Sequence, residues 1–199
     1  MPMMERVRTL AQNRLRPILM PSVRLLVRLQ ISPNQITFAG LVLALTASWL
    51  VILGWHVTAG IVFLFASILD LLDGLLARIA QKVTDFGAFL DSALDRVGEG
   101  TMFAAIAYYF ASQGQPSAVS MVVLAMLGGM LTSYTRARAE TFGLSCKGGV
   151  ASRPERVLII TAGLVLGLLL EAIYLLAVLS LWTAGQRIVR VYQNLPVSK

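Results

Sequence analysis

Six apolar stretches, each about as long as a membrane-spanning helix, constrain the fold of this chain more than any other feature. About 20 apolar residues in a helix cross the hydrocarbon core of a bilayer. Of the 199 residues, 57% are hydrophobic and only 14% are charged, whereas about a quarter of a soluble domain is charged. We therefore predict an all-α integral membrane protein with six transmembrane helices. The predicted spans cover approximately residues 34–54, 58–82, 84–112, 117–142, 154–171 and 173–193.

The residues before the first span form a separate, arginine-rich segment. Between residues 4 and 29, six arginines alternate with Leu, Val, Ile and Met, which predicts an amphipathic helix in the membrane interface, broken at a proline. The alternative is a basic arm in solvent. Aromatic residues between the basic ones are absent, so we expect no nucleic acid partner. The chain thus divides into a juxtamembrane segment, 1–30, and a six-helix domain, 31–199, whose first helix starts at a capping box of Ser32 and Gln35.

The basic residues are confined to one side of the predicted membrane topology. All 17 lysines and arginines lie in the N-terminal arm, the 82–85 turn, the 136–156 region, the C-terminal tail or the helix segments that adjoin them. The three turns on the opposite side contain none. Cytoplasmic loops carry such an excess of positive charge. We therefore predict a multi-pass protein of the cytoplasmic membrane with both termini in the cytoplasm.

Four aspartates lie inside two of these spans, although a carboxylate near the centre of a transmembrane helix costs about 2.5 kcal/mol or more. In an antiparallel hairpin that turns near residues 83–84, all four reach the same depth. Spacings of three and four place each pair on one helix face. Four crowded carboxylates cannot all ionise unaided, and ligands that are only oxygen atoms suit Mg²⁺, Mn²⁺ or Ca²⁺ better than Zn²⁺. The sequence predicts a divalent-cation site formed by Asp70, Asp73, Asp91 and Asp95.

The neighbours of these aspartates favour a phosphate ligand on the cytoplasmic side. Gly74 and Ala77 clear side chains from the face that carries the first two aspartates, and Gly87 does so on the next span. Arg78 can bind a phosphate group through two parallel hydrogen bonds. Metal ions, an arginine and a cleared surface together are typical of phosphoryl transfer.

Eight residues with fixed spacing also form a recognisable signature. The string D-x2-D-G-x2-A-R-x8-G-x3-D-x3-D resembles the signature of the CDP-alcohol phosphotransferase family. The number of spans, the N-terminal interfacial helix and the segment "SPNQIT" agree with that family, so the resemblance covers nearly the whole chain. The fixed positions are Asp70, Asp73, Gly74, Ala77, Arg78, Gly87, Asp91 and Asp95.

The resemblance implies a reaction and a set of roles. An acceptor hydroxyl attacks the β-phosphorus of a CDP-linked lipid, usually CDP-diacylglycerol, and CMP leaves. The first three aspartates hold two divalent cations, Mg²⁺ or Mn²⁺, and Asp95 is both a metal neighbour and the general base. Homodimers are usual in the family. The residues implied to contact the CDP moiety are Asp73, Gly74, Ala77, Arg78, Thr84 and Gly87.

Arginines at the cytoplasmic ends of the last three spans favour a phosphorylated acceptor, because such a cluster would bind a dianion better than neutral glycerol or inositol. They resemble the subgroup that makes phosphatidylinositol phosphate from inositol phosphate, although that subgroup usually has an acidic residue at Ser152 and has Lys at Arg136. Three alternatives remain. The acceptor could be glycerol 3-phosphate, the donor could be an archaeal-type lipid, or the arginines could only set the membrane topology. The arginines are Arg136, Arg138, Arg153, Arg156 and Arg187.

Two different classes of function remain as alternatives. A cation transporter would need carboxylates along a path, but only Glu99 continues from the four aspartates toward the other side. A non-catalytic scaffold would need their charges to be neutralised, for which Arg78 and Arg96 are too few. Glu99 itself either forms a structural hydrogen bond or joins the metal site, and Asp85 is expected to cap the third helix.

Overall fold

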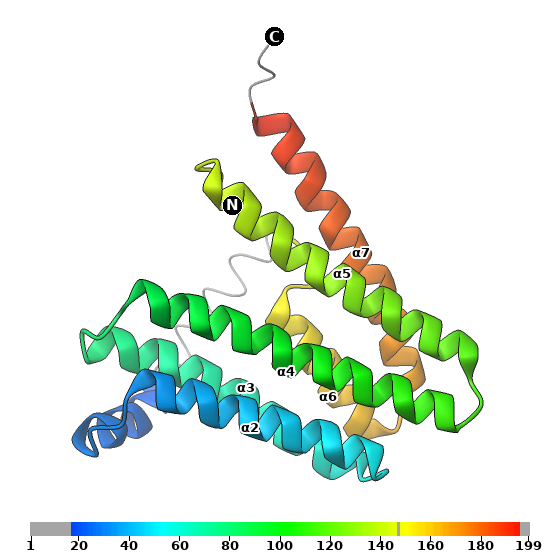
Figure 1. Ribbon diagram of the computed structural model, residues 1–199, viewed down its shortest axis with the longest axis horizontal. Coiled ribbons are helices and arrows are strands. Elements are labelled where there is room, and N and C mark those ends of the chain that lie inside the picture. The colour runs from blue at the N-terminus through cyan, green and yellow to red at the C-terminus, as the bar shows by residue number, and fades with distance from the viewer. Residues whose placement is uncertain (1–16, 147, 196–199) are drawn as a thin grey trace.

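The computed structural model describes residues 17–146 and 148–195, and these residues are helical with short connections (Figure 1). A helix at 17–28 precedes six longer ones, and these lie close to the predicted positions. The six helices are α2 (Pro33–Ile52), α3 (His56–Ile79), α4 (Asp85–Ser112), α5 (Pro116–Thr141), α6 (Arg153–Leu166) and α7 (Leu169–Asn194).

Side-chain caps start the two helices next to the predicted site. At α2, the Ser32 hydroxyl accepts a hydrogen bond from the Gln35 backbone N–H at 3.3 Å, and the Gln35 side chain accepts one from the Ser32 N–H at 2.8 Å. The predicted capping box is therefore confirmed. At α4, the cap is Thr84, and not Asp85 as predicted. Asp85 is the first residue of the helix, where its charge still faces the positive end of the helix macrodipole.

Four of the helices are long and apolar enough to cross a membrane, namely α2, α3, α5 and α7. The other two differ from the predicted spans. The 28 residues of α4 include several charged side chains of the predicted site. α6 has only 14 residues, because Gly167 adopts a left-handed conformation with φ of 72° and ends it early. The protein is thus an all-helical integral membrane protein in which four helices have ordinary spanning composition.

The helices pack as two groups, which are joined by the short helix α6 and by direct packing of α4 against α5. α2 packs against both α3 and α4, α5 packs along α7, and α6 contacts both α3 and α7. In Figure 1, α5 and α7 diverge from the other helices toward the C-terminus. Nearer the middle of both helices, α5 and α7 approach closely at Gly128, where a Cβ atom would lie 2.8 Å from the backbone nitrogen of Leu181. Because α5 and α7 diverge toward the C-terminus, the first residues of α6 can lie next to α3 and α4.

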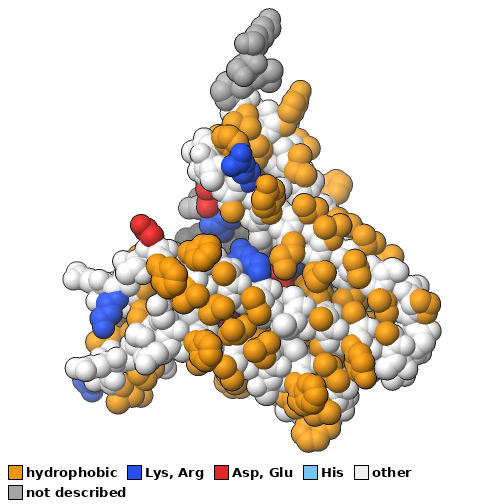
Figure 2. All heavy atoms as spheres, in the orientation of Figure 1, with side chains coloured by type: hydrophobic (Ala, Val, Ile, Leu, Met, Phe, Trp, Pro, Cys, Tyr) orange, Lys and Arg blue, Asp and Glu red, His pale blue; other side chains and the backbone are white. Residues whose placement is uncertain are grey.

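The surface separates charged from hydrophobic side chains. Charged side chains lie toward the α3–α4 turn and the diverging ends of α5 and α7, and hydrophobic ones cover much of the rest of the visible face (Figure 2). The helix at 17–28 turns Val23, which is fully buried, toward Ile36 and Leu76, while Arg24 and Arg28 are exposed. Ile18 and Leu25 are exposed as well, so that apolar and charged side chains share the exposed side of this helix, and its amphipathic character stays a prediction. Its place in the membrane interface stays a prediction, and residues 1–16 of the predicted segment lie outside the described ranges.

Candidate active site

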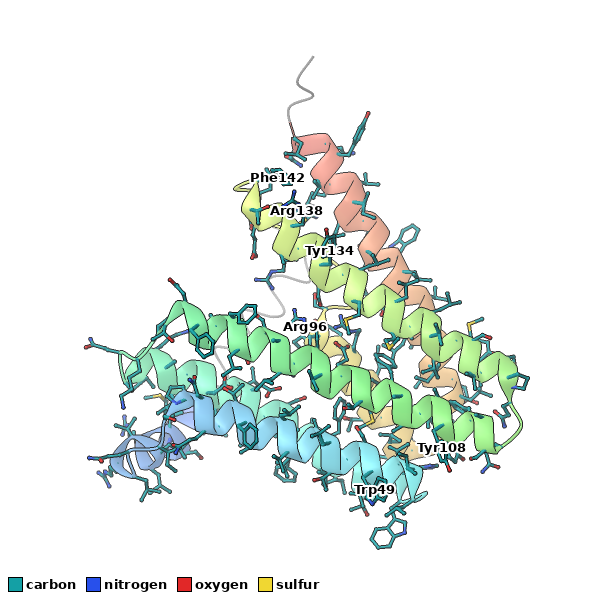
Figure 3. All side chains as sticks on the ribbon, in the orientation of Figure 1. Trp49, Arg96, Tyr108, Tyr134, Arg138 and Phe142 are labelled. Atoms are coloured by element: carbon teal, nitrogen blue, oxygen red, sulfur yellow. The ribbon has the colours of Figure 1, made fainter. Side chains whose placement is uncertain are left out.

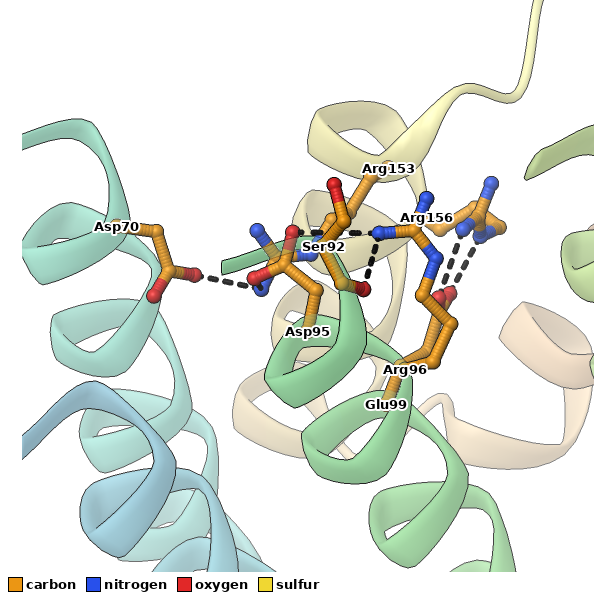
Figure 4. A network of polar contacts seen from close by, with 7 residues as sticks. All are labelled: Asp70, Ser92, Asp95, Arg96, Glu99, Arg153 and Arg156. Atoms are coloured by element: carbon orange, nitrogen blue, oxygen red, sulfur yellow. Dashed lines mark hydrogen bonds and ion pairs between the residues drawn. The ribbon is translucent and has the colours of Figure 1, made fainter. Parts of the chain in front are cut away.

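Two carboxylates from different helices bind the same guanidinium nitrogen (Figure 4). Nη2 of Arg153, the first residue of α6, lies 2.6 Å from Oδ2 of Asp70 on α3 and 2.7 Å from Oδ1 of Asp95 on α4. Facing carboxylates that both reach one cationic nitrogen can also both reach one hard divalent cation, which prefers oxygen ligands. The residues present therefore fit a divalent cation between α3 and α4.

The other two aspartates lie nearby but have different partners. Asp73 is buried and accepts a hydrogen bond of 2.7 Å from the hydroxyl of Thr37 on α2. The charge of Asp91 interacts with those of Asp70 and Arg153. Across the described ranges, no three acidic, histidine or cysteine side chains lie close enough together to form a ready-made metal site. Thr37 instead contacts Asp73, and Arg153 contacts both Asp70 and Asp95.

Thr37 contacts one of the four aspartates directly, although no sequence motif marks it as a site residue. Its position in "SPNQIT", one turn into α2, was visible in the sequence. The sequence does not show which face of α2 packs against α3, because α2 has no polar stripe that would mark a preferred face.

The residues predicted to contact CDP fall into two groups. A Cβ atom at Gly74 would meet nothing within 4 Å, so this face of α3 is open, as the cleared-surface interpretation requires. Ala77 is partly buried and Arg78 is exposed on the same helix. In contrast, a Cβ atom at Gly87 would lie 2.9 Å from the Thr84 hydroxyl, which accepts a hydrogen bond from the Gly87 N–H at 3.0 Å. At Gly87, the cap of α4 alone therefore accounts for the glycine.

Glu99 and Arg156 form a buried ion pair with two hydrogen bonds. Nε and Nη2 of Arg156 lie 2.5 and 2.8 Å from the two carboxylate oxygens of Glu99, and the side chains are 1% and 8% exposed. Nη1 of Arg156 donates to the Ala151 carbonyl at 3.0 Å. The structure thus favours the structural interpretation of Glu99. It also differs from the prediction at Arg156, because a guanidinium enclosed in this way is not presented to an acceptor phosphate.

We expect removal of either partner of this pair to destabilise the protein strongly. Glu99→Met or Arg156→Met alone leaves an uncompensated buried charge, which costs about 3–5 kcal/mol, whereas the double variant replaces the pair with apolar side chains and recovers most of the loss. The free energy of unfolding, measured by denaturant titration in detergent micelles, checks this.

The matched control is Arg136→Met, which removes one partner of an exposed pair. Arg136 and Glu140 are 49% and 50% exposed and lie 2.9 Å apart, so its free energy of unfolding is expected to change by less than about 0.5 kcal/mol. An Arg156→Met protein as stable as the Arg136→Met protein would contradict a structural role for the buried pair.

Arg187 holds the loop that leads into α6. The side chain is buried, and its guanidinium donates to the Gly148 carbonyl at 3.0 Å, to the Ser152 hydroxyl at 3.2 Å and to the Thr132 carbonyl. Ser152 directly precedes Arg153. Arg187 therefore fixes the loop through which Arg153 enters the site.

The last two predicted arginines lie on α5 and contact residues of their own helix end. Nε of Arg136 donates to Glu140, and the guanidinium of Arg138 lies 4.9 Å from the ring centre of Phe142 (Figure 3). Of the five arginines predicted to bind the acceptor, Arg153 is the one that the structure brings into contact with the aspartates.

Comparisons with known proteins agree with this architecture. A profile of the CDP-alcohol phosphatidyltransferase family matches residues 30–186. The archaetidylinositol phosphate synthase of Methanothermobacter thermautotrophicus is 36% identical over 174 residues, which cover 84% of this chain and 87% of that protein. The phosphatidylinositol phosphate synthase of Mycobacteroides abscessus is 36% identical over 177 residues, which cover 84% of this chain and 80% of the relative.

Solved structures show the same fold. The crystal structure of Mycobacterium tuberculosis phosphatidylinositol phosphate synthase with CDP-DAG bound superposes with a TM-score of 0.84 at 29% identity, covering 92% of this chain and 98% of that one. A structure of the same synthase in complex with manganese and citrate gives a TM-score of 0.83 and covers 90% and 91% of the two chains. The profile, the relatives and the fold confirm the resemblance seen in the signature, and the chain is a multi-pass membrane enzyme that belongs to the CDP-alcohol phosphatidyltransferase family.

Proposed function

We propose that the enzyme transfers a phosphatidyl group from CDP-diacylglycerol to inositol phosphate and releases CMP. The names of the relatives support the acceptor more strongly than the lipid, because archaetidylinositol phosphate and phosphatidylinositol phosphate share the inositol phosphate part and differ in the lipid. The bound CDP-DAG in the mycobacterial structure supports the class of donor.

The shared contact of Asp70 and Asp95 with Arg153 is the observation that carries the proposed site. We propose that Asp70, Asp73, Asp91 and Asp95 hold two divalent cations, Mg²⁺ or Mn²⁺, in line with the manganese complex of the relative. Such cations neutralise negative charge on a diphosphate as its P–O bond breaks. Asp95 takes the proton of the acceptor hydroxyl while that oxygen bonds to the β-phosphorus and the bond to CMP breaks.

The open face of α3 supports a position for the CDP moiety. Gly74 lets a ligand approach the helix backbone, because nothing lies within 4 Å of the position of its missing side chain. Arg78, one turn farther along and exposed, is placed to pair with a phosphate. We propose that these two residues, with Asp73 and Ala77, line the CDP site, and that the Thr84–Gly87 cap borders it at the start of α4.

For the acceptor, we propose that Arg153 binds the phosphate. A divalent cation would take over the oxygens of Asp70 and Asp95 that Arg153 now contacts, which would free this guanidinium for an anion. Arg136 and Arg138 lie on the exposed end of α5 and would contribute positive charge, while Arg187 supports the loop that carries Arg153. Arg156 is left out because Glu99 binds it.

The proposed topology places this site on the cytoplasmic side. All six long helices would cross the membrane: the acidic residues of α4 would face the site instead of lipid, and α6, about 21 Å long at 1.5 Å per residue, would be shielded between α3 and α7. The segment 1–30 would lie in the interface beside the domain formed by 31–199. Both termini would be cytoplasmic, and a homodimer is expected from the family.

The experiment that tests the function is an assay of CMP release from CDP-diacylglycerol by the purified enzyme with a panel of acceptors. Inositol phosphate, glycerol 3-phosphate, serine and free inositol are offered separately at equal concentration. We expect inositol phosphate to give the highest kcat/KM. Faster turnover with glycerol 3-phosphate would assign the enzyme to phosphatidylglycerophosphate synthesis, and equal use of free inositol would contradict a phosphate-binding acceptor site.

Arg153→Ala is expected to raise the acceptor KM and to leave the KM for CDP-diacylglycerol nearly unchanged. A charge-assisted hydrogen bond contributes about 1.5–3 kcal/mol, which corresponds to a fall of about ten- to a hundredfold in kcat/KM. Arg153→Lys should recover only part of this, because Lys cannot reproduce the planar fork of Arg. Steady-state kinetics with each substrate varied in turn give both KM values.

Arg190→Ala serves as the control, since Arg190 is an exposed arginine near the end of α7 that the proposed site does not use. Its acceptor KM is expected to match that of the unaltered enzyme. If both arginine variants changed the acceptor KM alike, the effect would come from general surface charge and not from recognition at Arg153.

A further inference from the structure

We infer that α2, which supplies none of the four aspartates, positions the two aspartates of α3 for cation binding through Thr37 and Gly40. This inference rests on the proposed cation site. It assigns the two residues a positioning role, because they act through Asp73 and Asp70 and touch no reacting atom themselves.

The first contact is a buried hydrogen bond. The Thr37 hydroxyl lies 2.7 Å from Oδ2 of Asp73, and both residues are 5% exposed. It also lies 3.1 Å from the Pro33 carbonyl, but a hydroxyl has one proton, and the shorter contact goes to the group that carries the charge. A threonine side chain has few rotamers, so the donor is held in place.

This hydrogen bond selects how Asp73 faces the site. It uses one lone pair of Oδ2 and leaves Oδ1 and the second lone pair of Oδ2 for a cation. Residues behind metal ligands that orient them in this way change metal affinity about ten- to a hundredfold when they are altered. Without the hydroxyl, the buried carboxylate would lose its fixed direction.

The second contact is a space left for Asp70. Gly40 lies three residues after Thr37, on the same face of α2, and a Cβ atom there would lie 2.9 Å from Oδ1 of Asp70. That distance is below a normal contact, so the carboxylate would have to move. The other oxygen, Oδ2, makes the contact with Arg153, and a shift of the group would therefore turn the oxygen away from the point it shares with Asp95.

Thr37 and Gly40 lie on the same face of α2, and both favour the positions that the aspartates of α3 adopt. Thr37 attracts Asp73, Gly40 makes room for Asp70, and α2 packs against both α3 and α4. A glycine inside a helix lowers helix stability relative to alanine. The room that Gly40 leaves for Asp70 gives a reason for a residue that is locally unfavourable at this position.

The test measures Mn²⁺ binding to the purified full-length protein in detergent without substrates, by electron paramagnetic resonance of free Mn²⁺. Thr37→Val keeps the shape of the side chain and removes the donor, so the dissociation constant is expected to rise about tenfold or more. Thr37→Ser restores the donor and should return to within about threefold of the unaltered protein. Gly40→Ala is expected to weaken binding by a similar factor as Thr37→Val.

Two matched controls carry the same substitutions elsewhere. Thr46→Val, also on α2, removes a hydroxyl that bonds to the Val42 carbonyl of its own helix at 2.8 Å. Gly100→Ala adds a Cβ atom whose nearest neighbour is the terminal methyl of Met130 at 3.9 Å. Both controls should bind Mn²⁺ like the unaltered protein, and thermal unfolding in EDTA shows that each variant is folded.

The outcomes separate the inference from the proposed function. If the unaltered protein binds no Mn²⁺, the proposed cation site and the inference are both overturned. If it binds Mn²⁺ and folded Thr37→Val and Gly40→Ala proteins bind it equally well, only the positioning role of α2 is overturned. Should Thr37→Val fail to fold, the comparison of Gly40→Ala with Gly100→Ala decides the inference alone.

Discussion

Excess EDTA is expected to abolish CMP release from CDP-diacylglycerol, and added Mg²⁺ or Mn²⁺ is expected to restore it. The proposed reaction brings a diphosphate next to four aspartates, and Arg153 is the side chain that two of them contact. Arg96 lies 3.7 Å from Asp95 as well, but two guanidinium groups cannot neutralise the charge of four carboxylates together with that of the diphosphate. The measurement is the rate of CMP release at saturating substrates before and after chelation.

The same contacts predict that the loss is reversible. Nη2 of Arg153 contacts both Asp70 and Asp95, so its positive charge would offset part of the repulsion between these two carboxylates once the cations are removed. The thermal unfolding midpoint in EDTA should therefore stay close to that in buffer while activity is lost. Full activity in excess EDTA would contradict the proposed cations, and irreversible unfolding in EDTA would contradict the role of Arg153 as a substitute cation.

Asp95→Asn is expected to lower kcat by about a hundred- to ten-thousandfold, the usual contribution of a general acid or base. Asparagine has the size of aspartate but cannot accept the proton of the acceptor hydroxyl. Because this proton belongs to the acceptor, binding of CDP-diacylglycerol should change little. Asp73→Asn should weaken cation-dependent nucleotide binding as well. Single-turnover CMP release and equilibrium binding of the CDP-lipid measure the two effects separately.

Asp85→Asn is the matched control, because Asp85 lies on the same helix as Asp95 but is exposed at its first residue. This variant should keep nearly full kcat. If Asp95→Asn lost nucleotide affinity as severely as Asp73→Asn, Asp95 would be acting mainly as a cation ligand, and its additional role as the base would lose support.

Features that depend on neighbouring residues in the sequence were predictable. The capping box of Ser32 and Gln35 starts α2 as predicted, because both partners lie within one helical turn. The positions of α2, α3, α5 and α7 follow from apolar length. The early end of α6 did not follow, since a glycine in an apolar stretch continues a helix in one context and ends it in another. Thr84 and Asp85 are both good caps, and the backbone path of the turn decided for Thr84.

Contacts between helices required the tertiary structure. Arg153 and Arg156 are three residues apart at the start of α6, and from the sequence they were equal candidates for the acceptor phosphate. Packing places Arg153 between Asp70 and Asp95 and encloses Arg156 with Glu99. The reason is geometric, because residue spacing determines which side chains share a face of one helix. The partner of that face depends on which helix packs opposite it and at what depth.

The sequence by itself determined that this chain is a helical membrane protein and to which family it belongs, and it predicted a cation site at four aspartates of two adjacent helices. Each of these depends on residue type and spacing along the chain. Only the tertiary structure decided that Thr37 of α2 contacts Asp73, that Gly40 of α2 leaves room for Asp70, and that Arg153 is the predicted acceptor arginine that reaches the aspartates. Those contacts join residues more than 25 positions apart, and only the packing of α2 and α6 against α3 brings them together.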